Sequence, residues 1–200
     1  RRGSAAGRGG RVRIIAGAFG GRRLRVPAAP GLRPTPERTR ETLFNWLQGG
    51  IEGARVLDLF AGSGALAFEA LSRGAAAAVL VERRREALGI LREAAAEIAP
   101  ERTRIVAGDA LAWLRRADEA PFDLVFLDPP FAGDLARRAL AALDGGARLA
   151  PEARVYVEWP TAGPSPVDPA RWETFGSTRS GDSSGALLAR RASGRSTTVA

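Results

Sequence analysis

The chain contains no cysteine, no histidine and no lysine among its 200 residues. The absence of cysteine and histidine excludes disulfides, thiolate or imidazole metal sites, a Ser-His-Asp triad and the cysteine nucleophile that cytosine C5 methylation needs. Carboxylates, backbone groups and a cofactor must therefore carry any reaction. Methionine is also absent, including at position 1, so we expect translation to start before residue 1.

Long hydrophobic runs are also absent. No apolar stretch approaches the roughly 18 to 20 residues of a membrane-spanning helix, and no charged and then apolar leader opens the chain. We therefore expect a cytoplasmic protein without a membrane partner. A length of 200 residues with 45% hydrophobic content suits one main domain with an appendage. We take the protein to be a monomer.

Positive charge is concentrated at the start of the chain. Residues 1–40 hold 11 arginines and one acid, net +10, whereas the remainder holds 19 arginines and 21 acids, net −2. This asymmetry is typical of a nucleic-acid-facing arm on a nearly neutral catalytic body, because arginine pairs bidentately with phosphates. A solvated basic tail is the alternative, and for residues 1–10 we do predict a disordered basic tail. Residues 192–200 are predicted to form a second disordered tail.

Residues 11–50 form the predicted RNA-binding segment. Residues 11–15 and 22–26 flank Gly20-Gly21 and predict a short β-hairpin with arginines on its exposed face. Thr35-Pro36-Glu37 predicts the start of a helix that has Thr35 as its N-cap and ends near Gln48. The arginines expected to contact phosphates are Arg11, Arg13, Arg22, Arg23, Arg25, Arg33 and Arg38.

Residues 51–191 alternate short apolar runs with helical segments, which predicts an α/β catalytic domain with a mostly parallel sheet. Strands are expected at residues 56–60, 78–82, 104–107, 123–128 and 154–159, and helices at 64–73, 84–98, 110–117 and 134–143. The near-continuous apolar run at 123–128 predicts a central strand. Weaker runs at 172–177 and 186–190 predict an antiparallel pair at the sheet edge, which completes seven strands.

The segment from Asp58 to Gly64 (DLFAGSG) joins the first of these strands to a helix. Glycine permits a tight turn there and lets a ligand approach the backbone closely. Continued to Ala67, the segment also matches the dinucleotide fingerprint G-x-G-x-x-[G/A]. By itself it leaves a nicotinamide site and an S-adenosylmethionine site equally open.

Three acids in or directly after the predicted strands bear on that choice. Asp58 would repel a pyrophosphate and attract a cationic amino-acid group, which favours S-adenosylmethionine. Glu82 can accept hydrogen bonds from ribose hydroxyls in either case. Asp109 can accept from an adenine amino group, although capping the following helix is an equally ordinary role. The predicted cofactor-binding residues are Asp58, Phe60, Ala61, Gly62, Ser63, Gly64, Glu82, Asp109 and Ala110.

The segment Asp128-Pro129-Pro130-Phe131 decides between the two cofactors, because a dehydrogenase has no evident use for an acid and a rigid Pro-Pro turn after this strand. Each proline removes an N–H, which leaves the carbonyls of Asp128 and Pro129 free to accept hydrogen bonds. Such bonds from an exocyclic base amine would direct its nitrogen at a methyl group, and Phe131 would stack on the base. We predict that these four residues are catalytic, that the base is unstacked as in RNA loops, and that no metal takes part.

These residues resemble one known family, the bacterial 16S ribosomal RNA guanine-N2 methyltransferases (the RsmD family). The resemblance is carried by RIIAG (13–17), GLRPTPERTRETLFNWL (31–47), DLFAGSGALAFEALSRGA (58–75) and DPPF (128–131). It implies a Rossmann-like class I methyltransferase fold, S-adenosylmethionine as donor, and methylation of one guanine N2 in the small ribosomal subunit. It also implies that Arg33 and Thr35 help to close the site over S-adenosylmethionine.

Two alternatives remain open from the residues alone. An Asp-Pro-Pro-aromatic site could also serve a DNA base or a protein amide, since it recognises planar amines in general. An NAD-dependent oxidoreductase would account for the glycine loop but not for Asp58 or the Pro-Pro turn. The choice of guanine over adenine or cytosine rests on the family resemblance.

Overall fold

A seven-stranded sheet forms the centre of the computed structural model, which describes residues 10–28, 35–116, 118–131 and 133–191. The strand order is β5-β4-β3-β6-β7-β9-β8. Strands β3 to β7 run parallel, and β9 and β8 complete the sheet as an antiparallel edge pair, as predicted. The bounds are β3 (Arg55–Asp58), β4 (Ala77–Glu82), β5 (Thr103–Ala107), β6 (Phe122–Leu127), β7 (Leu149–Pro160), β8 (Trp172–Ser180) and β9 (Ser183–Arg190).

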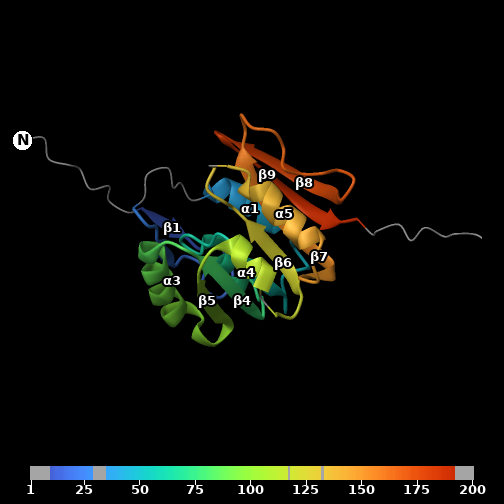
Figure 1. Ribbon diagram of the computed structural model, residues 1–200. Helices are drawn as coiled ribbons and strands as arrows, with labels where there is room; N and C mark the ends of the chain where they lie inside the picture. The colour runs from blue at the N-terminus through green and yellow to red at the C-terminus, as the bar shows by residue number, and fades with distance from the viewer. Residues whose placement is uncertain (1–9, 29–34, 117, 132, 192–200) are drawn as a thin grey trace, which may run out of the picture.

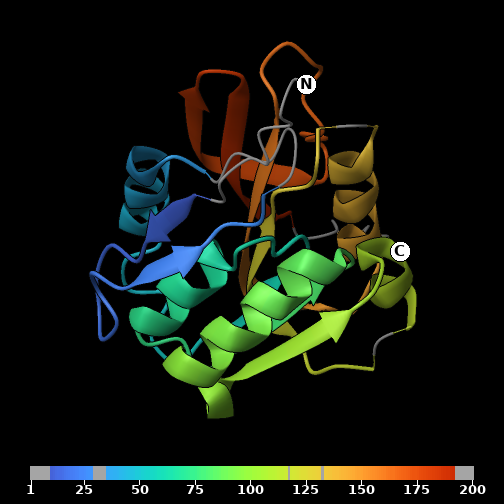
Figure 2. The same ribbon diagram turned by 90° about the vertical axis from the view of Figure 1, so that its left-hand side faces the viewer.

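Helices cover both faces of the sheet, in the Rossmann-like arrangement that was predicted (Figure 1). Helices α1 (Glu37–Trp46), α2 (Ala65–Ser72) and α3 (Arg85–Ile98) lie on one face, and α4 (Ala110–Arg116) and α5 (Leu135–Asp144) on the other. A short 3₁₀ turn, η1 (Pro100–Arg102), leads into β5. Figure 2 shows α2 and α3, in green, lying across the first face beside the blue hairpin.

The central strand β6 explains why its sequence reads as an unbroken apolar run. Leu124 and Phe126 belong to the core cluster under α1, α2 and α3, whereas Val125 and Leu127 belong to the cluster under α4 and α5. Because successive side chains of a strand point to opposite faces, a strand that is covered on both faces needs apolar residues at every position. The predicted central position of this strand is confirmed.

The N-terminal hairpin is shorter than predicted, with β1 (Arg11–Arg13) and β2 (Arg23–Arg25). Val12 and Leu24 are buried in the same core cluster as the sheet, so the hairpin packs on the catalytic domain. The predicted strand continuation at Ile15 is wrong for a physical reason. The backbone N–H of Ile15 donates to the Glu69 carboxylate of α2 at 2.6 Å instead of to a strand partner.

The start of α1 also differs from the prediction. The N-cap residue is Pro36, which provides no side-chain cap, and the hydroxyl of Thr35 bonds to distant acids instead. The edge strands are longer than predicted, because Gly181 at φ +57° turns β8 directly back into β9. Strand β7 starts early, because Leu149 pairs with Phe122 before a register shift.

The longest helix in the described ranges, α3, has 14 residues, and none of the helices there is both long and apolar enough to cross a membrane. The predicted disordered tails are residues 1–10 and 192–200, of which 1–9 and 192–200 lie outside the described residues, as does Arg33. Gly10 is described, and its carbonyl accepts a hydrogen bond from the Val26 N–H at 3.0 Å, so the tail prediction is wrong at that residue.

Candidate functional site

The candidate site lies at the carboxyl ends of two neighbouring strands, β3 and β6. Asp58 is the last residue of β3, and Asp128 directly follows β6. The chain leaves β3 toward β4 on one side, whereas β6 and β7 lie on the other, so this point is the topological switch of the sheet. Ligands of open α/β sheets bind at such a switch point, outside the carboxyl ends of the strands.

The glycine loop makes the tight turn that the sequence predicts. Gly62 has φ +55° and Gly64 has φ +76°, both in the left-handed region that favours glycine. A Cβ atom at Gly64 would lie only 2.5 Å from a ring carbon of Phe68, so the turn has no room for a side chain there. The loop backbone at Gly64 therefore packs closely on α2. Gly62 has no side chain and Ser63 has a small one, so a ligand could approach the backbone there.

Glu82, at the end of β4, holds the glycine loop in place. Its Oε2 accepts a hydrogen bond from the Gly62 N–H at 2.9 Å. Its Oε1 accepts from the N–H groups of Arg83 at 2.9 Å and Arg84 at 2.8 Å. Each carboxylate oxygen has about two acceptor positions, so Oε2 keeps one for a ligand hydroxyl. The predicted role of Glu82 toward a ribose stays a prediction.

Asp109 occupies the helix-capping role that the sequence left open. Its Oδ1 accepts a hydrogen bond from the Ala112 N–H at 2.8 Å, which caps α4. Asp109 is exposed, and Ala110 is buried in the first turn of the helix. Phe60 is half-buried and packs on the core under α4 and α5, and Ala61 is buried. Their predicted roles in cofactor binding stay predictions.

A third acid, Glu158 on β7, completes the site and was missed by the sequence analysis. The register places Leu127 opposite Val157, so Asp128 and Glu158 follow side by side. The Thr35 hydroxyl lies between them, with Oγ1 2.9 Å from Glu158 Oε1 and 3.3 Å from Asp128 Oδ2. An acid inside the apolar run 154–159 was the available signal for it.

The carboxyl groups of this site are strongly affected by burial. Asp58 is 2% exposed, and burial raises its pKa to about 7, with a smaller contribution from the charge of Glu82. Burial, followed by the charges of Glu158 and Asp58, raises the pKa of Asp128 well above its usual range. Burial likewise raises the pKa of Tyr156, whose hydroxyl donates to Glu158 at 3.0 Å.

Asp58, Asp128 and Glu158 form an acidic cluster without an arginine partner in the part of the chain that the structure describes. Within the described residues, no arginine forms an ion pair with Asp58, Asp128 or Glu158. Arginine is abundant in the chain, which has 30 basic residues, so these acids are not unpaired for want of arginines. A site with several carboxylates and no resident cation favours a ligand that brings positive charge. The described residues include no group of three or more His, Cys, Asp or Glu placed to hold a metal ion.

A pocket of about 270 Å³ adjoins the acidic cluster on the α5 side. The Pro129-Pro130 turn, Phe131, Glu158 and Trp159 contribute to its wall, and none of its lining residues comes from the glycine loop. Phe131 is 45% exposed, which is unusual for a large apolar side chain and leaves its ring accessible. The pocket is therefore separate from the glycine loop, and Asp128 precedes the Pro129-Pro130 turn in its wall.

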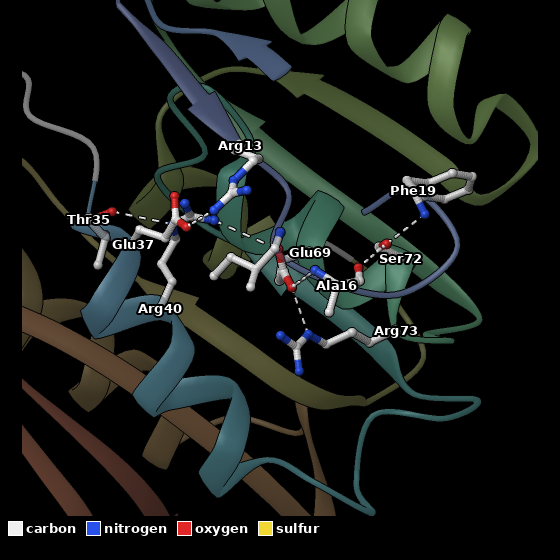
Figure 3. A network of polar contacts seen from close by, with 10 residues as sticks. Arg13, Ala16, Phe19, Thr35, Glu37, Arg40, Glu69, Ser72 and Arg73 are labelled. Carbon is white, nitrogen blue, oxygen red and sulfur yellow. Dashed lines mark hydrogen bonds and ion pairs between the residues drawn. The ribbon is translucent and has the colours of Figure 1, made fainter. Parts of the chain in front are cut away.

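Thr35 is held in position by a buried ion pair (Figure 3). The Arg40 Nε group of α1 donates to the Thr35 carbonyl at 3.3 Å, and its Nη1 atom lies 3.8 Å from Glu69 Oε2. Both side chains of this pair are at most 1% exposed. Glu69 also binds Arg73 at 2.7 Å, and burial lowers the pKa of Arg40. Helix α2 thus supports both the glycine loop and the segment that carries Thr35.

The arginines predicted to contact phosphates are exposed wherever the structure describes them, and four of them share one face of the hairpin. The register places Arg11 opposite Arg25 and Arg13 opposite Arg23. Like charges directly opposite each other repel, so negative charge near this face would stabilise it.

Acids of the neighbouring helices neutralise part of this hairpin face. Arg13 forms an ion pair with Glu37, and Arg25 forms one with Glu93 at 2.9 Å. Arg22 donates to the carbonyl of Glu97 at 3.1 Å. Within the described ranges, the side chains of Arg11, Arg23 and Arg38 form no hydrogen bond or ion pair, which leaves them open to a ligand.

Comparison with known proteins identifies the family. A family model described as Conserved hypothetical protein 95 matches residues 12–189. The chain is 42% identical over 187 residues to the Ribosomal RNA small subunit methyltransferase D of Escherichia coli (strain K12), which covers 94% of both proteins. The chain belongs to the RsmD family. An RsmD relative from Haemophilus influenzae is 41% identical over 166 residues, covering 82% of this chain and 86% of that protein.

Solved structures agree with this membership of the RsmD family. The structure of the Escherichia coli protein yhhF has a TM-score of 0.81 and 41% sequence identity to this chain, and the match covers 92% of this chain and 99% of that one. The RsmD-family chain is accordingly a methyltransferase and uses a methyl donor. The comparisons do not favour an NAD-dependent oxidoreductase.

Proposed function

We propose that the chain transfers a methyl group from S-adenosylmethionine to the exocyclic N2 amine of a guanine in 16S ribosomal RNA. The observation that carries this proposal is the position of Asp128, which lies beside Asp58 at the switch point and is followed by the rigid Pro129-Pro130 turn. The name of the 42% identical Escherichia coli relative supports ribosomal RNA of the small subunit as the substrate.

The residues at the glycine loop fit S-adenosylmethionine. When bound, this donor supplies an electrophilic methyl group on a positively charged sulfur, and it carries a cationic amino group as well. Asp58, Asp128 and Glu158 have no arginine partner within the described residues, so the charge of the donor would supply the missing cation. The open acceptor position on Glu82 Oε2 suits a ribose hydroxyl, and the turn at Gly62 lets the ligand approach the backbone.

The acceptor amine would bind at Asp128 from the side of the pocket. The nitrogen of an exocyclic amine shares its lone pair with the ring, so it is a weak nucleophile. Hydrogen bonds from its two N–H groups to the Asp128 carboxylate and the Pro129 carbonyl would draw electron density onto nitrogen and orient it. The exposed ring of Phe131 lies at the pocket wall, where it can stack on an unstacked base.

The hairpin would hold the RNA backbone. Four of its arginines face solvent on one surface, and the two without a partner among the described residues, Arg11 and Arg23, lie on opposite strands. Phosphates passing over this surface would bind several guanidinium groups at once. The assembled small subunit, with its ordered RNA backbone, is the substrate that we propose.

The test of the proposed function is incubation of the protein with isotopically labelled S-adenosylmethionine and unmethylated small ribosomal subunits, followed by nucleoside mass spectrometry. We expect label in N2-methylguanosine. Label in another nucleoside would refute the assignment of guanine, and label only in a DNA base or in protein would refute RNA as the substrate.

The Asp128→Ala variant tests the role of the carboxylate. We expect the methylation rate to fall by about 100- to 1,000-fold, the range for loss of one aligned charge-stabilising group. Calorimetry should still show binding of S-adenosylmethionine, because the glycine loop is intact. Asp118→Ala is a matched control. Asp118 is exposed in the loop before β6, so it lies at the amino end of that strand, away from the site at its carboxyl end. Full activity of Asp128→Ala would exclude the proposed role.

The double variant Arg11→Gln/Arg23→Gln tests the hairpin surface. We expect weaker binding to the small subunit and a shallower dependence on salt, because each lost phosphate contact removes about 0.7 to 0.9 from the slope of log K against log salt. Arg115→Gln/Arg116→Gln on α4 removes the same charge from the other face of the protein. Equal effects of the two double variants would argue for non-specific charge attraction.

A further inference from the structure

Two carboxyl groups lie next to each other where the acceptor amine would bind. Asp128 and Glu158 directly follow a pair of opposed residues on β6 and β7, so they lie side by side. The Thr35 hydroxyl joins them, with Oγ1 2.9 Å from Glu158 Oε1 and 3.3 Å from Asp128 Oδ2. The proposed binding of the amine uses Asp128 and the Pro129 carbonyl, and it assigns no role to Glu158.

The hydrogen bonds on Glu158 leave one acceptor position open. Oε1 accepts from two hydroxyl groups, those of Thr35 at 2.9 Å and Tyr156 at 3.0 Å. Among the described residues, Oε2 accepts only from the Ser183 hydroxyl, at 2.6 Å. Each carboxylate oxygen can accept about two hydrogen bonds, so Oε2 keeps a position for a further donor. Glu158 also contributes to the wall of the 270 Å³ pocket, from which the acceptor base is proposed to reach Asp128.

Glu158 offers this open position as a charged acceptor. Its three partners are hydroxyl groups that donate to the carboxylate, and such hydrogen bonds favour the charged form. No described arginine forms an ion pair with it. Glu158 is 3% exposed, so water could not screen it from a bound base. An N–H group of the base would be attracted to this carboxylate, whereas a ring nitrogen with a lone pair would be repelled.

The bases that carry an exocyclic amine differ in the ring nitrogen beside it. In guanine the amine is on C2, and the neighbouring N1 carries a hydrogen. In adenine the neighbouring N1 carries a lone pair instead, and in cytosine the neighbouring N3 does. A second acid beside the acid that binds the amine therefore matches the Watson–Crick edge of guanine and opposes the edges of the other two bases.

We propose that Glu158 selects guanine by accepting a hydrogen bond from its N1–H at Oε2. The inference rests on the proposed function, since it adds one contact to the same bound base. The amine would donate to Asp128 and to the Pro129 carbonyl, and the adjacent N1–H would donate to Glu158. Two neighbouring kinds of donor on the base would then meet two neighbouring acids. Adenine or cytosine would direct a lone pair at a buried carboxylate, which leaves that carboxylate without a partner.

This role gives a reason for an acid at position 158. The charge of Glu158 adds to the effect of burial in raising the pKa of Asp128, so the second acid opposes the ionised form that binds the amine. Glutamine could form hydrogen bonds with the surrounding hydroxyl groups without this effect. An N–H group of the substrate gives the carboxylate a function that an amide would fill poorly.

A comparison of two acceptor bases tests the inference with the wild-type protein. Small subunits are reconstituted with 16S RNA that carries guanine or 2-aminopurine at the position that the labelling experiment identifies. 2-Aminopurine keeps the C2 amine, but its N1 has a lone pair in place of the hydrogen. We expect kcat/KM for 2-aminopurine to be about 100-fold lower, within the range for a specific base contact. Equal methylation of the two bases would overturn the inference, even if variants of Glu158 failed to fold.

The Glu158→Gln variant separates this residue from the rest of the pocket. Its amide oxygen should take the Oε1 position, where two hydroxyl groups donate, which leaves the amide nitrogen at the Oε2 position. That nitrogen would repel the N1–H of guanine and donate to N1 of 2-aminopurine, so we expect the preference for guanine to disappear or reverse. Glu152→Gln, at an exposed position of the same strand, should keep the wild-type preference.

An unchanged preference in Glu158→Gln would overturn the inference, because the missing O6 atom of 2-aminopurine affects both proteins equally. A wild-type protein that methylates guanine and 2-aminopurine equally would refute the selection by Glu158 and leave the proposed function standing. A wild-type protein that methylates neither base would refute the proposed function itself, so the two failures are distinguishable.

Discussion

Replacing Asp58 with asparagine tests how much stability the protein gives up to keep a carboxylate in the core. The pKa of Asp58 rises from an ordinary 3.8 to about 7 on folding. The folded state therefore binds this proton more tightly than the unfolded state. This difference stabilises the fold fully below about pH 4, and the stabilisation is lost as the pH rises to about 7. Integrating this difference between pH 5 and pH 8 predicts a loss of about 2 to 3 kcal/mol in the free energy of unfolding.

Urea unfolding of the ligand-free protein at pH 5, 6, 7 and 8 measures this loss. We expect the stability of Asp58→Asn to fall less over this range than that of the wild type, by about 2 to 3 kcal/mol, because an amide does not titrate. Asp58→Asn also removes the Asp58 charge that raises the pKa of Asp128, which reduces the pH dependence of the variant in the same direction. A stability difference between the two proteins that stays constant from pH 5 to pH 8 would refute the assigned cost of burial.

Donor binding should respond to the same titration in the opposite direction. The ionised form of Asp58 attracts the cationic donor, so the affinity of the wild type for S-adenosylmethionine should rise as the pH passes about 7. Calorimetry of Asp58→Asn should show weaker binding and less dependence on pH. A wild-type affinity that falls over this range would argue against an electrostatic role for Asp58.

Three further variants follow from the structure. Gly64→Ala should destabilise the protein by roughly 2 to 4 kcal/mol in urea unfolding, because it combines a positive φ with a clash, whereas Gly89→Ala, in open space on α3, should be neutral or stabilising. Glu69→Ala should cost about 3 to 5 kcal/mol by leaving a buried arginine without its carboxylate, and the exposed Glu93→Ala should cost at most about 1 kcal/mol; similar costs would refute the role of burial. Phe131→Ala should leave the melting temperature nearly unchanged and lower methylation by about 5- to 100-fold through lost stacking; full activity would exclude that contact.

Local patterns in the sequence were sufficient for the sheet, the crossover helices and the glycine turn. The apolar run of β6 and the alternation of strands with helices are local signals, and each reports burial on one or both faces. Asp58 was predicted to bind the cofactor and Asp128 to be catalytic, each from its own local motif, and the parallel sheet of the structure brings the two together. Part of the site was therefore predictable without coordinates.

The remaining part depends on contacts between distant segments. Thr35 was predicted to cap a helix, but Glu158, which is 123 positions further along the chain, accepts its hydrogen bond instead. The sequence analysis assigned no role to Glu69, because its partners, Arg40 and the backbone of the hairpin, lie in distant segments of the chain. Strand register and contacts between distant segments decide these roles. The local periodicity of the sequence carries no information about either.

The hydrogen bonds that join α2 to the segment after β1 have a consequence for how the protein selects its RNA target. Glu69 and Ser72 of α2 bind the backbone that follows β1, and α2 begins at the glycine turn. The surface proposed to grip phosphates and the turn proposed to hold the donor are thus joined by one short, buried element. The distance between the hairpin arginines and the Asp128 carboxylate is therefore fixed by the packing of the fold. A nucleotide could be methylated only if its base reaches Asp128 while phosphates elsewhere in the folded RNA reach the hairpin. The RNA sequence between the base and those phosphates would not matter.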